Sequence, residues 1–206
     1  MTTAQKVNGK RGAEYGIMVE HELAARIDGH RTNTNISKTD VIEGTEKCHS
    51  VKNTRKSAHC RFLARTYNVV MNSEWNIFKR YIEARNNKNV SEEYIACAKI
   101  CDKMNDSSHG YTILQEVIAG KSGVANFMSI YDNRAERTNE DLSAHFRCFE
   151  IKDILTLYNK KLTWMTKKGR KHWNIIGMLQ GFPHIAITIS LGSPRRRLLL
   201  FTFCNV

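Results

Sequence analysis

Residues 40–52 read DVIEGTEKCHSVK, and this stretch decides the fold that the sequence predicts. An apolar run, a glycine-containing turn and a second run after it are typical of a β-hairpin. If the turn centres on Thr45, Asp40 pairs with Ser50 across the two strands. Side chains alternate between the faces of a strand, so Ser50 and Lys52 then share one face, with Asp40 nearby. A carboxylate, a hydroxyl and an ammonium group on one face suit a divalent cation and a water molecule next to a phosphodiester.

This hairpin resembles the core of the PD-(D/E)xK nucleases, which include many type II restriction enzymes, archaeal Holliday-junction resolvases and some homing endonucleases. The family pattern is Asp, a short gap, and then Glu or Asp, any residue and Lys; Asp40 matches the first position and Lys52 the last. Ser50 stands where the acid is usual, as in a subset of restriction enzymes in which a carboxylate from elsewhere completes the metal site. The resemblance covers roughly residues 12–60. It implies catalytic roles for Asp40, Ser50 and Lys52, with the Val51 carbonyl as a neutral metal ligand.

The missing carboxylate has two candidates. Residues 16–23 resemble the helix before the hairpin in the resolvases, where a Glu points into the site, so Glu20 is the first candidate catalytic residue and metal ligand. Glu22 lies about 200° around the same helix and cannot share that direction. Glu74 is the alternative, because serine-variant restriction enzymes tend to keep their extra carboxylate on a later helix. The expected cation is Mg²⁺, which prefers oxygen ligands with some anionic charge, and Mn²⁺ is expected to substitute.

Two other sites remain open. Glu150 and Lys152 repeat the Glu-x-Lys spelling after a second apolar run, with Asp132 as the upstream acid. A zinc site is the second alternative, and its four ligands would be Cys48, His49, His59 and Cys60. Neighbouring residues on a strand point to opposite faces, so the first two of these cannot easily converge on one ion.

The composition favours a globular protein with a polyanionic partner. The 206 residues suffice for one domain with a proper core, and 41% are hydrophobic. The net charge of +12 points to nucleic acid, because each Lys or Arg placed on a phosphate releases counterions. Neither a transmembrane-length apolar run nor a signal-peptide core is present, so we expect a cytoplasmic protein that does not bind a membrane, with free thiols at its six cysteines.

Basic residues gather in three clusters, of which the first two are predicted to contact double-stranded DNA. The cluster after the hairpin contains Arg55, Lys56, Arg61 and Arg65. The second cluster has aromatic residues between its charges and contains Lys160, Lys161, Trp164, Lys167, Lys168, Arg170, Lys171 and Trp173. Such interleaving fits contact with both backbone and bases. The third, at residues 195–197, is equally typical of a solvated loop.

The pattern along the chain predicts an α/β fold with a restriction-endonuclease-like core, in which a small mixed sheet is flanked by helices. A flexible basic arm at 1–12 precedes a single nuclease domain at 13–206. Within this domain we expect a catalytic core at about 13–70, a helical insertion at about 70–120 and a DNA-contacting part at about 121–206. Helical patterns cover residues 14–27, 57–67, 74–86, 91–104 and 111–119, and β-rich runs cover 126–131, 145–150, 184–190 and 198–204.

The predicted function is Mg²⁺-dependent, site-specific cleavage of double-stranded DNA by a type II restriction or homing endonuclease. A homodimer is expected, because one site per chain cuts one strand and a two-fold dimer presents two sites to antiparallel strands. A structure-selective nuclease such as a Holliday-junction resolvase is one alternative. A non-catalytic DNA-binding protein with a decayed nuclease site is another, since Ser50 in place of an acid fits that history as well.

Overall fold

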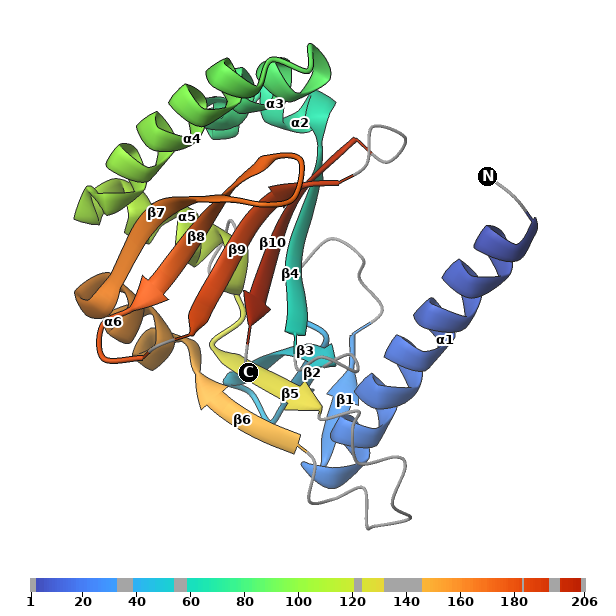
Figure 1. Cartoon of the computed structure of the whole chain (residues 1–206). Helices are drawn as coiled ribbons and strands as arrows, with labels where there is room; N and C mark the ends of the chain where they lie inside the picture. Colours follow the sequence, from blue (N-terminus) through green and yellow to red (C-terminus); the bar gives the residue numbers. More distant parts are fainter. Residues whose placement is uncertain are drawn as a thin grey trace. The chain divides into compact units, whose positions relative to one another are not determined.

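The computed structural model describes residues 3–32, 39–53, 59–120, 124–131, 146–182, 184–192 and 197–204 (Figure 1). The chain divides into two compact units. The first unit comprises Met1–Ala58 and Ile118–Asp153, and the second comprises His59–Val117 and Ile154–Val206. The first half of the second unit therefore lies in the chain between two parts of the first.

A mixed five-stranded sheet forms the centre of the first unit, in the order β1-β2-β3-β5-β6. Its strands are β1 (Gly29–Arg31), β2 (Val41–Glu43), β3 (Lys47–Asn53), β5 (Phe127–Tyr131) and β6 (Phe146–Glu150). Strands β3 and β5 pair in parallel, and every other neighbouring pair is antiparallel. Parallel neighbours need a long crossover, and the segment that enters the second unit supplies it.

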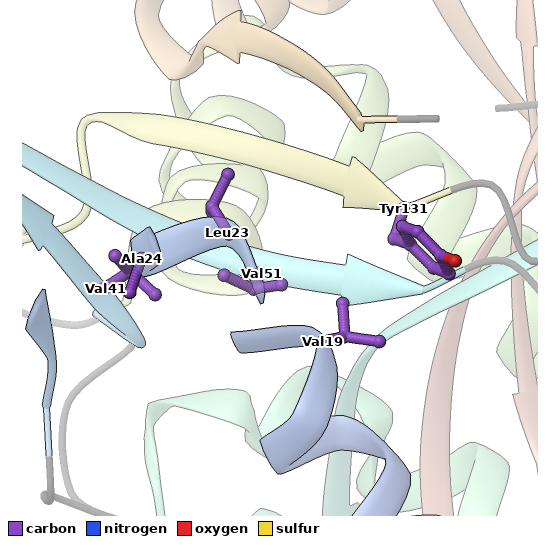
Figure 2. Packing of buried hydrophobic residues seen from close by; sticks show 6 residues of the cluster. All are labelled: Val19, Leu23, Ala24, Val41, Val51 and Tyr131. Atoms are coloured by element: carbon purple, nitrogen blue, oxygen red, sulfur yellow. The ribbon is translucent and has the colours of Figure 1, made fainter. Parts of the chain in front are cut away.

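Helix α1 (Thr3–Arg26) packs on one face of this sheet. Val19 and Leu23 lie one turn apart on the helix and form a buried cluster with Val41, Val51 and Tyr131 (Figure 2). Each of these five side chains is at most 9% exposed, so their burial holds the helix against the strands.

Helix α1 begins earlier than the sequence pattern suggested. Residues 3–12, which we expected as a flexible basic arm, have helical backbone. Good helix formers such as Ala4, Gln5 and Lys6 and the absence of proline allow the helix to extend over this segment.

The second unit holds an antiparallel five-stranded sheet in the order β4-β10-β9-β8-β7. Its strands are β4 (His59–Thr66), β7 (Leu162–Lys168), β8 (Trp173–Leu179), β9 (Ile185–Leu191) and β10 (Leu198–Cys204). Its helical segments are α2 (Tyr67–Met71), the 3-10 helix η1 (Glu74–Phe78), α3 (Lys79–Asn86) and α4 (Val90–Asn105). Helices α5 (Ser107–Ala119) and α6 (Ile151–Lys161) begin in one unit and end in the other.

Aromatic packing joins the helices of the second unit to its sheet. The rings of Trp75 and Phe78 on η1 meet Phe201 of β10 edge-on, with centroids 5.6 and 6.0 Å away. All three side chains are at most 3% exposed. The α/β class is thus confirmed, with mixed and antiparallel sheets flanked by helices.

One sequence expectation is wrong at the start of the second unit. The segment 57–67 was expected to be helical, but His59–Thr66 is strand β4 and pairs with β10 over its whole length. The partner strand lies more than a hundred residues later, so its hydrogen bonds decide the conformation without leaving a local signal. The helices expected at 74–86, 91–104 and 111–119 are present, and Asn89 caps α4 by accepting from the Glu92 N–H.

Candidate functional site

The hairpin at residues 40–52 turns about Thr45. Val41 faces His49, and Glu43 faces Lys47, in an antiparallel register. Gly44 has φ +60°, a conformation that glycine adopts without steric cost. Continued by one residue, the same register places Asp40 opposite Ser50.

Asp40 is held by the backbone on both sides. Its N–H donates to the His49 carbonyl oxygen at 2.8 Å, and its own carbonyl accepts from the Thr32 N–H at 2.9 Å. Its carboxylate Oδ2 accepts from the Val51 N–H at 2.7 Å. The carboxylate thus caps a backbone position of β3 that lies beyond the last residue paired with β2. The Asp40 carboxylate is therefore fixed at the point where β2 and β3 stop pairing.

The Lys52 side chain contacts oxygens of Asp40, Ser50 and Val51. Its Nζ donates to the Val51 carbonyl oxygen at 2.7 Å and to Ser50 Oγ at 2.8 Å, and it lies 3.4 Å from Asp40 Oδ2. An ammonium has three N–H donors, and these oxygens give it three partners. The Lys52 side chain is 16% exposed and that of Asp40 is 26% exposed, so solvent still reaches the group. The structure therefore brings Asp40, Ser50, Val51 and Lys52 together.

Strand alternation separates this group from α1. Val41 and Val51 pack against the helix, whereas Ser50 and Lys52 on the same strand point to the opposite face. Ser50 has no exposed surface, and its hydroxyl is occupied by Lys52.

The oxygen donors of this group suit a divalent cation, but the group lacks a second negative charge. Asp40, Ser50 and the Val51 carbonyl offer hard oxygen donors of the kind that Mg²⁺ prefers, but only Asp40 brings a negative charge. Among the residues that the structure describes, no three His, Cys, Asp or Glu side chains gather as a metal site. A second carboxylate would have to join Asp40 from elsewhere.

The first candidate for that carboxylate, Glu20, is paired elsewhere, and the Glu74 side chain lies outside the described part of the chain. Glu20 on α1 accepts a short hydrogen bond from Arg31 Nε on β1, and the two side chains are about one-fifth exposed. Glu22 forms a separate pair with Arg26 on the same helix. Glu74 opens η1 and belongs to the second unit.

The zinc alternative loses its first histidine. His49 is 1% exposed, and both ring nitrogens are used: Nδ1 bonds Ser129 Oγ at 2.8 Å, and Nε2 bonds Glu43 Oε2 at 3.2 Å. Its ring also stacks on Phe127 with centroids 5.2 Å apart. Burial lowers the pKa of His49, although the bond to Glu43 opposes this shift. His49 is therefore a buried histidine whose two ring nitrogens are both hydrogen-bonded, and it links β3 to β2 and β5.

The second Glu-x-Lys spelling does not form a comparable group. Strand β6 ends at Glu150, and Lys152 lies in the first turn of α6. Their side chains form an ion pair of 2.8 Å, but the lysine is 78% exposed and the glutamate 43%. Asp132 lies outside the described residues.

The predicted DNA-contacting residues have different surroundings. Arg55, Lys56 and the Arg61 side chain lie outside the described part of the chain, whereas Arg65 donates to Glu116 at 2.9 Å and lies over the Trp75 ring. In the second cluster, the exposed residues are Lys160, Lys161, Lys167, Lys168, Arg170 and Lys171. Arg195 and Arg196 lie outside the described residues, and Arg197 is exposed.

Trp164 requires a correction, because it is only 4% exposed and cannot offer its ring to a base. Its backbone N–H donates to Asn105 Oδ1 at 2.8 Å, and its carbonyl accepts from Asn105 Nδ2 at 3.0 Å, so β7 is fastened to α4 at this point. The alternation of aromatic and basic residues in the sequence could not reveal the burial of Trp164, because it does not tell which face of the strand packs against a helix.

The accessible aromatic surface near these lysines is instead made by Trp173 and Tyr94. Their ring centroids are 4.7 Å apart, and Tyr94 is 45% exposed. Sequence reasoning missed Tyr94, although Val90 and Tyr94 one turn apart would have signalled an apolar stripe on α4.

Comparisons with family models, with curated proteins and with solved structures found no match to this chain. Within the described part of the chain, no helix is both long and apolar enough to cross a membrane.

Proposed function

We propose that this chain is a metal-dependent DNA endonuclease with its site at Asp40, Ser50, Val51 and Lys52. The observation that carries the proposal is the convergence of Lys52 Nζ on oxygens of the other three residues at 2.7 to 3.4 Å. A structural lysine gains little from being held at the open end of a strand pair beside a carboxylate. A lysine that must act on a phosphodiester gains a fixed position there.

The finer assignment, to a restriction-endonuclease-like core, rests on the order of elements in the first unit. A helix precedes three antiparallel strands, and a crossover then leads to β5, which is parallel to β3. This arrangement supports the resemblance drawn from the hairpin. The proposal includes site-specific cleavage by a homodimer, which sedimentation on duplex DNA would test.

Each residue of the group has a distinct task in the proposed reaction. Asp40 and the Val51 carbonyl would hold a divalent cation, which when bound lowers the pKa of a water molecule and stabilises charge on the phosphate. Lys52 offsets negative charge that develops on the phosphoryl oxygens, and one of its N–H donors exchanges its present oxygen partner for the attacking water. Ser50 accepts from Lys52 and fixes the direction of its side chain.

The test is nicking of a supercoiled plasmid by the full-length protein. We expect nicked and then linear product with Mg²⁺ or Mn²⁺ and none with a chelator. Sequencing the product ends would separate site-specific from structure-selective cleavage. Binding to the plasmid without cleavage under every metal condition would favour the alternative, a DNA-binding protein with a decayed site.

A further inference from the structure

The second unit carries most of the positive charge of the chain. Residues 154–206 contain no Asp or Glu and nine Lys or Arg, so this quarter of the sequence supplies three quarters of the net charge of +12. Six of these basic residues precede β8, in the last turn of α6, in β7 and in the β7–β8 turn, and all six are exposed. The partner of this surface must therefore be anionic.

An aromatic pair lies within this basic surface. The Tyr94 ring on α4 and the Trp173 ring at the start of β8 are 4.7 Å apart and tilted by 50°. Lys168, paired with Trp173 across the two strands, places Nζ 5.8 Å from the centroid of the Trp173 ring. Val90, one turn before Tyr94, is 44% exposed and extends the apolar surface.

Buried polar contacts hold the aromatic pair in place. Glu93, next to Tyr94, is 1% exposed and accepts from Arg85 at 2.6 Å and from the Trp173 N–H at 3.1 Å. The Trp173 carbonyl accepts from the Tyr81 hydroxyl at 2.8 Å. Both backbone groups of Trp173 are thus bonded to α3 and α4, which holds this residue beside Tyr94. A rigid aromatic surface loses little conformational entropy on binding.

We propose that Tyr94 and Trp173 form a stacking site for an unpaired base, with Lys168, Arg170 and Lys171 on the adjoining phosphates. Stacking needs an exposed base face, which single strands, frayed ends and branch points offer and an intact duplex does not. The inference rests on the proposed function only for the identity of the polymer as DNA. It sharpens the substrate to DNA with a locally unpaired strand.

The alternative partner that these residue types would also suit is an acidic membrane surface, because Trp, Tyr and Lys also gather at lipid headgroups. Placement of two packed rings beside the Lys168 ammonium favours the nucleic acid, since headgroups need no fixed ring geometry. Vesicles that contain phosphatidylserine therefore serve as a competing ligand in the test.

Binding of the full-length protein to a labelled single strand, in chelator to prevent cleavage, tests the stacking site. We expect Tyr94→Ala to weaken binding roughly tenfold, the loss of about one stacked base. Tyr94→Phe should keep the affinity because the ring remains. Tyr111→Ala is the matched control, since Tyr111 is an exposed aromatic residue on α5. An abasic strand of equal length should bind wild type and Tyr94→Ala alike.

Tryptophan fluorescence gives a second readout. Trp75 and Trp164 are 3% and 4% exposed, so quenching by a bound strand reports mainly on Trp173. We expect the single strand to quench the protein and the abasic strand to quench it much less, with Trp173→Phe removing the difference.

Three results would overturn the stacking site: equal single-strand affinity of Tyr94→Ala and wild type, an equal loss on intact duplex, or displacement of the strand by phosphatidylserine vesicles. Because the measurement excludes metal, an inactive protein that still shows the Tyr94 effect would refute the nuclease proposal and leave the stacking site standing.

Discussion

Two short segments of the first unit spell nearly the same motif, and the structure treats them differently. Ser50-Val51-Lys52 lies within β3, and Lys52 bends back to three oxygens with 16% of its side chain exposed. Glu150-Ile151-Lys152 lies where β6 gives way to α6, and Lys152 is 78% exposed. The segment that matches the Glu-x-Lys pattern fully is therefore the one whose lysine is more exposed.

The difference arises from what surrounds each segment. Strand β3 is central, and it continues past the end of β2, so its backbone groups are open to the Asp40 carboxylate. Strand β6 is at the edge of the sheet and ends at Glu150 itself. In a strand the first and third residues share a face, whereas the turn into a helix breaks that relation. A motif of this kind therefore needs a continuing strand and an upstream acid.

The largest expected effect is a difference in plasmid cleavage between variants of Lys52 and variants of Lys152. Lys52→Ala and Asp40→Ala should lower plasmid cleavage by at least about a hundredfold, because the first removes a positive charge placed at the reacting phosphate and the second removes the carboxylate that would hold the metal. Retention of DNA by both variants is expected, since the basic clusters bind phosphates without the metal. Nicking assays and gel-shift titrations measure the two properties.

The second segment supplies the matched controls. Lys152→Ala and Glu150→Gln should cleave at the wild-type rate, because the exposed pair contributes nothing to the group around Asp40. A wild-type rate for Lys52→Ala, or a large loss for Lys152→Ala, would reverse the assignment of the site.

A smaller effect concerns the acid that the first segment lacks at Ser50. Glu20 can complete the metal site only if it leaves Arg31 and α1 shifts, because α1 packs on the sheet face opposite Ser50 and Lys52. If it does so, Glu20→Gln should raise the Mg²⁺ concentration needed for half-maximal cleavage by about tenfold. Arg31→Gln breaks the same ion pair and keeps the carboxylate, and its metal dependence should be unchanged. If both variants lose only thermal stability, Glu20 serves α1 and β1 alone, and Glu74→Gln is the next test.

Sequence reasoning reached local features and missed those that depend on distant partners. The register of the hairpin followed from its turn at Thr45, and the apolar spacing of α1 was visible as Val19 and Leu23. The strand β4 and the burial of Trp164 were not visible, because β10 and Asn105 determine them. The contact between Glu20 and Arg31 likewise depends on how β1 lies beside α1, which no spacing in the sequence encodes.

The smallest expected effect lies in the residues that precede the two motifs. His49 is buried before Ser50, whereas Phe149 before Glu150 is 38% exposed. Burial lowers the pKa of His49, so below about pH 6.5 the unfolded chain takes up a proton that the folded chain resists. Stability from this residue is therefore present above that pH and falls as the pH drops toward the pKa of folded His49.

Thermal unfolding between about pH 7.5 and 5.5 measures this loss, which one proton limits to about 1.4 kcal/mol per pH unit. His49→Gln also breaks bonds to Glu43 and Ser129, so its stability is lower at every pH and the slope is the quantity to compare. We expect a flatter slope for His49→Gln and an unchanged slope for Phe149→Leu. The pKa of Glu43 is lowered mainly by its bond to Lys47, and that contribution is lost only below about pH 4.5, outside this window. An identical slope in His49→Gln and wild type would show that His49 titrates alike in both states, and that burial does not distinguish β3 from β6 in this way.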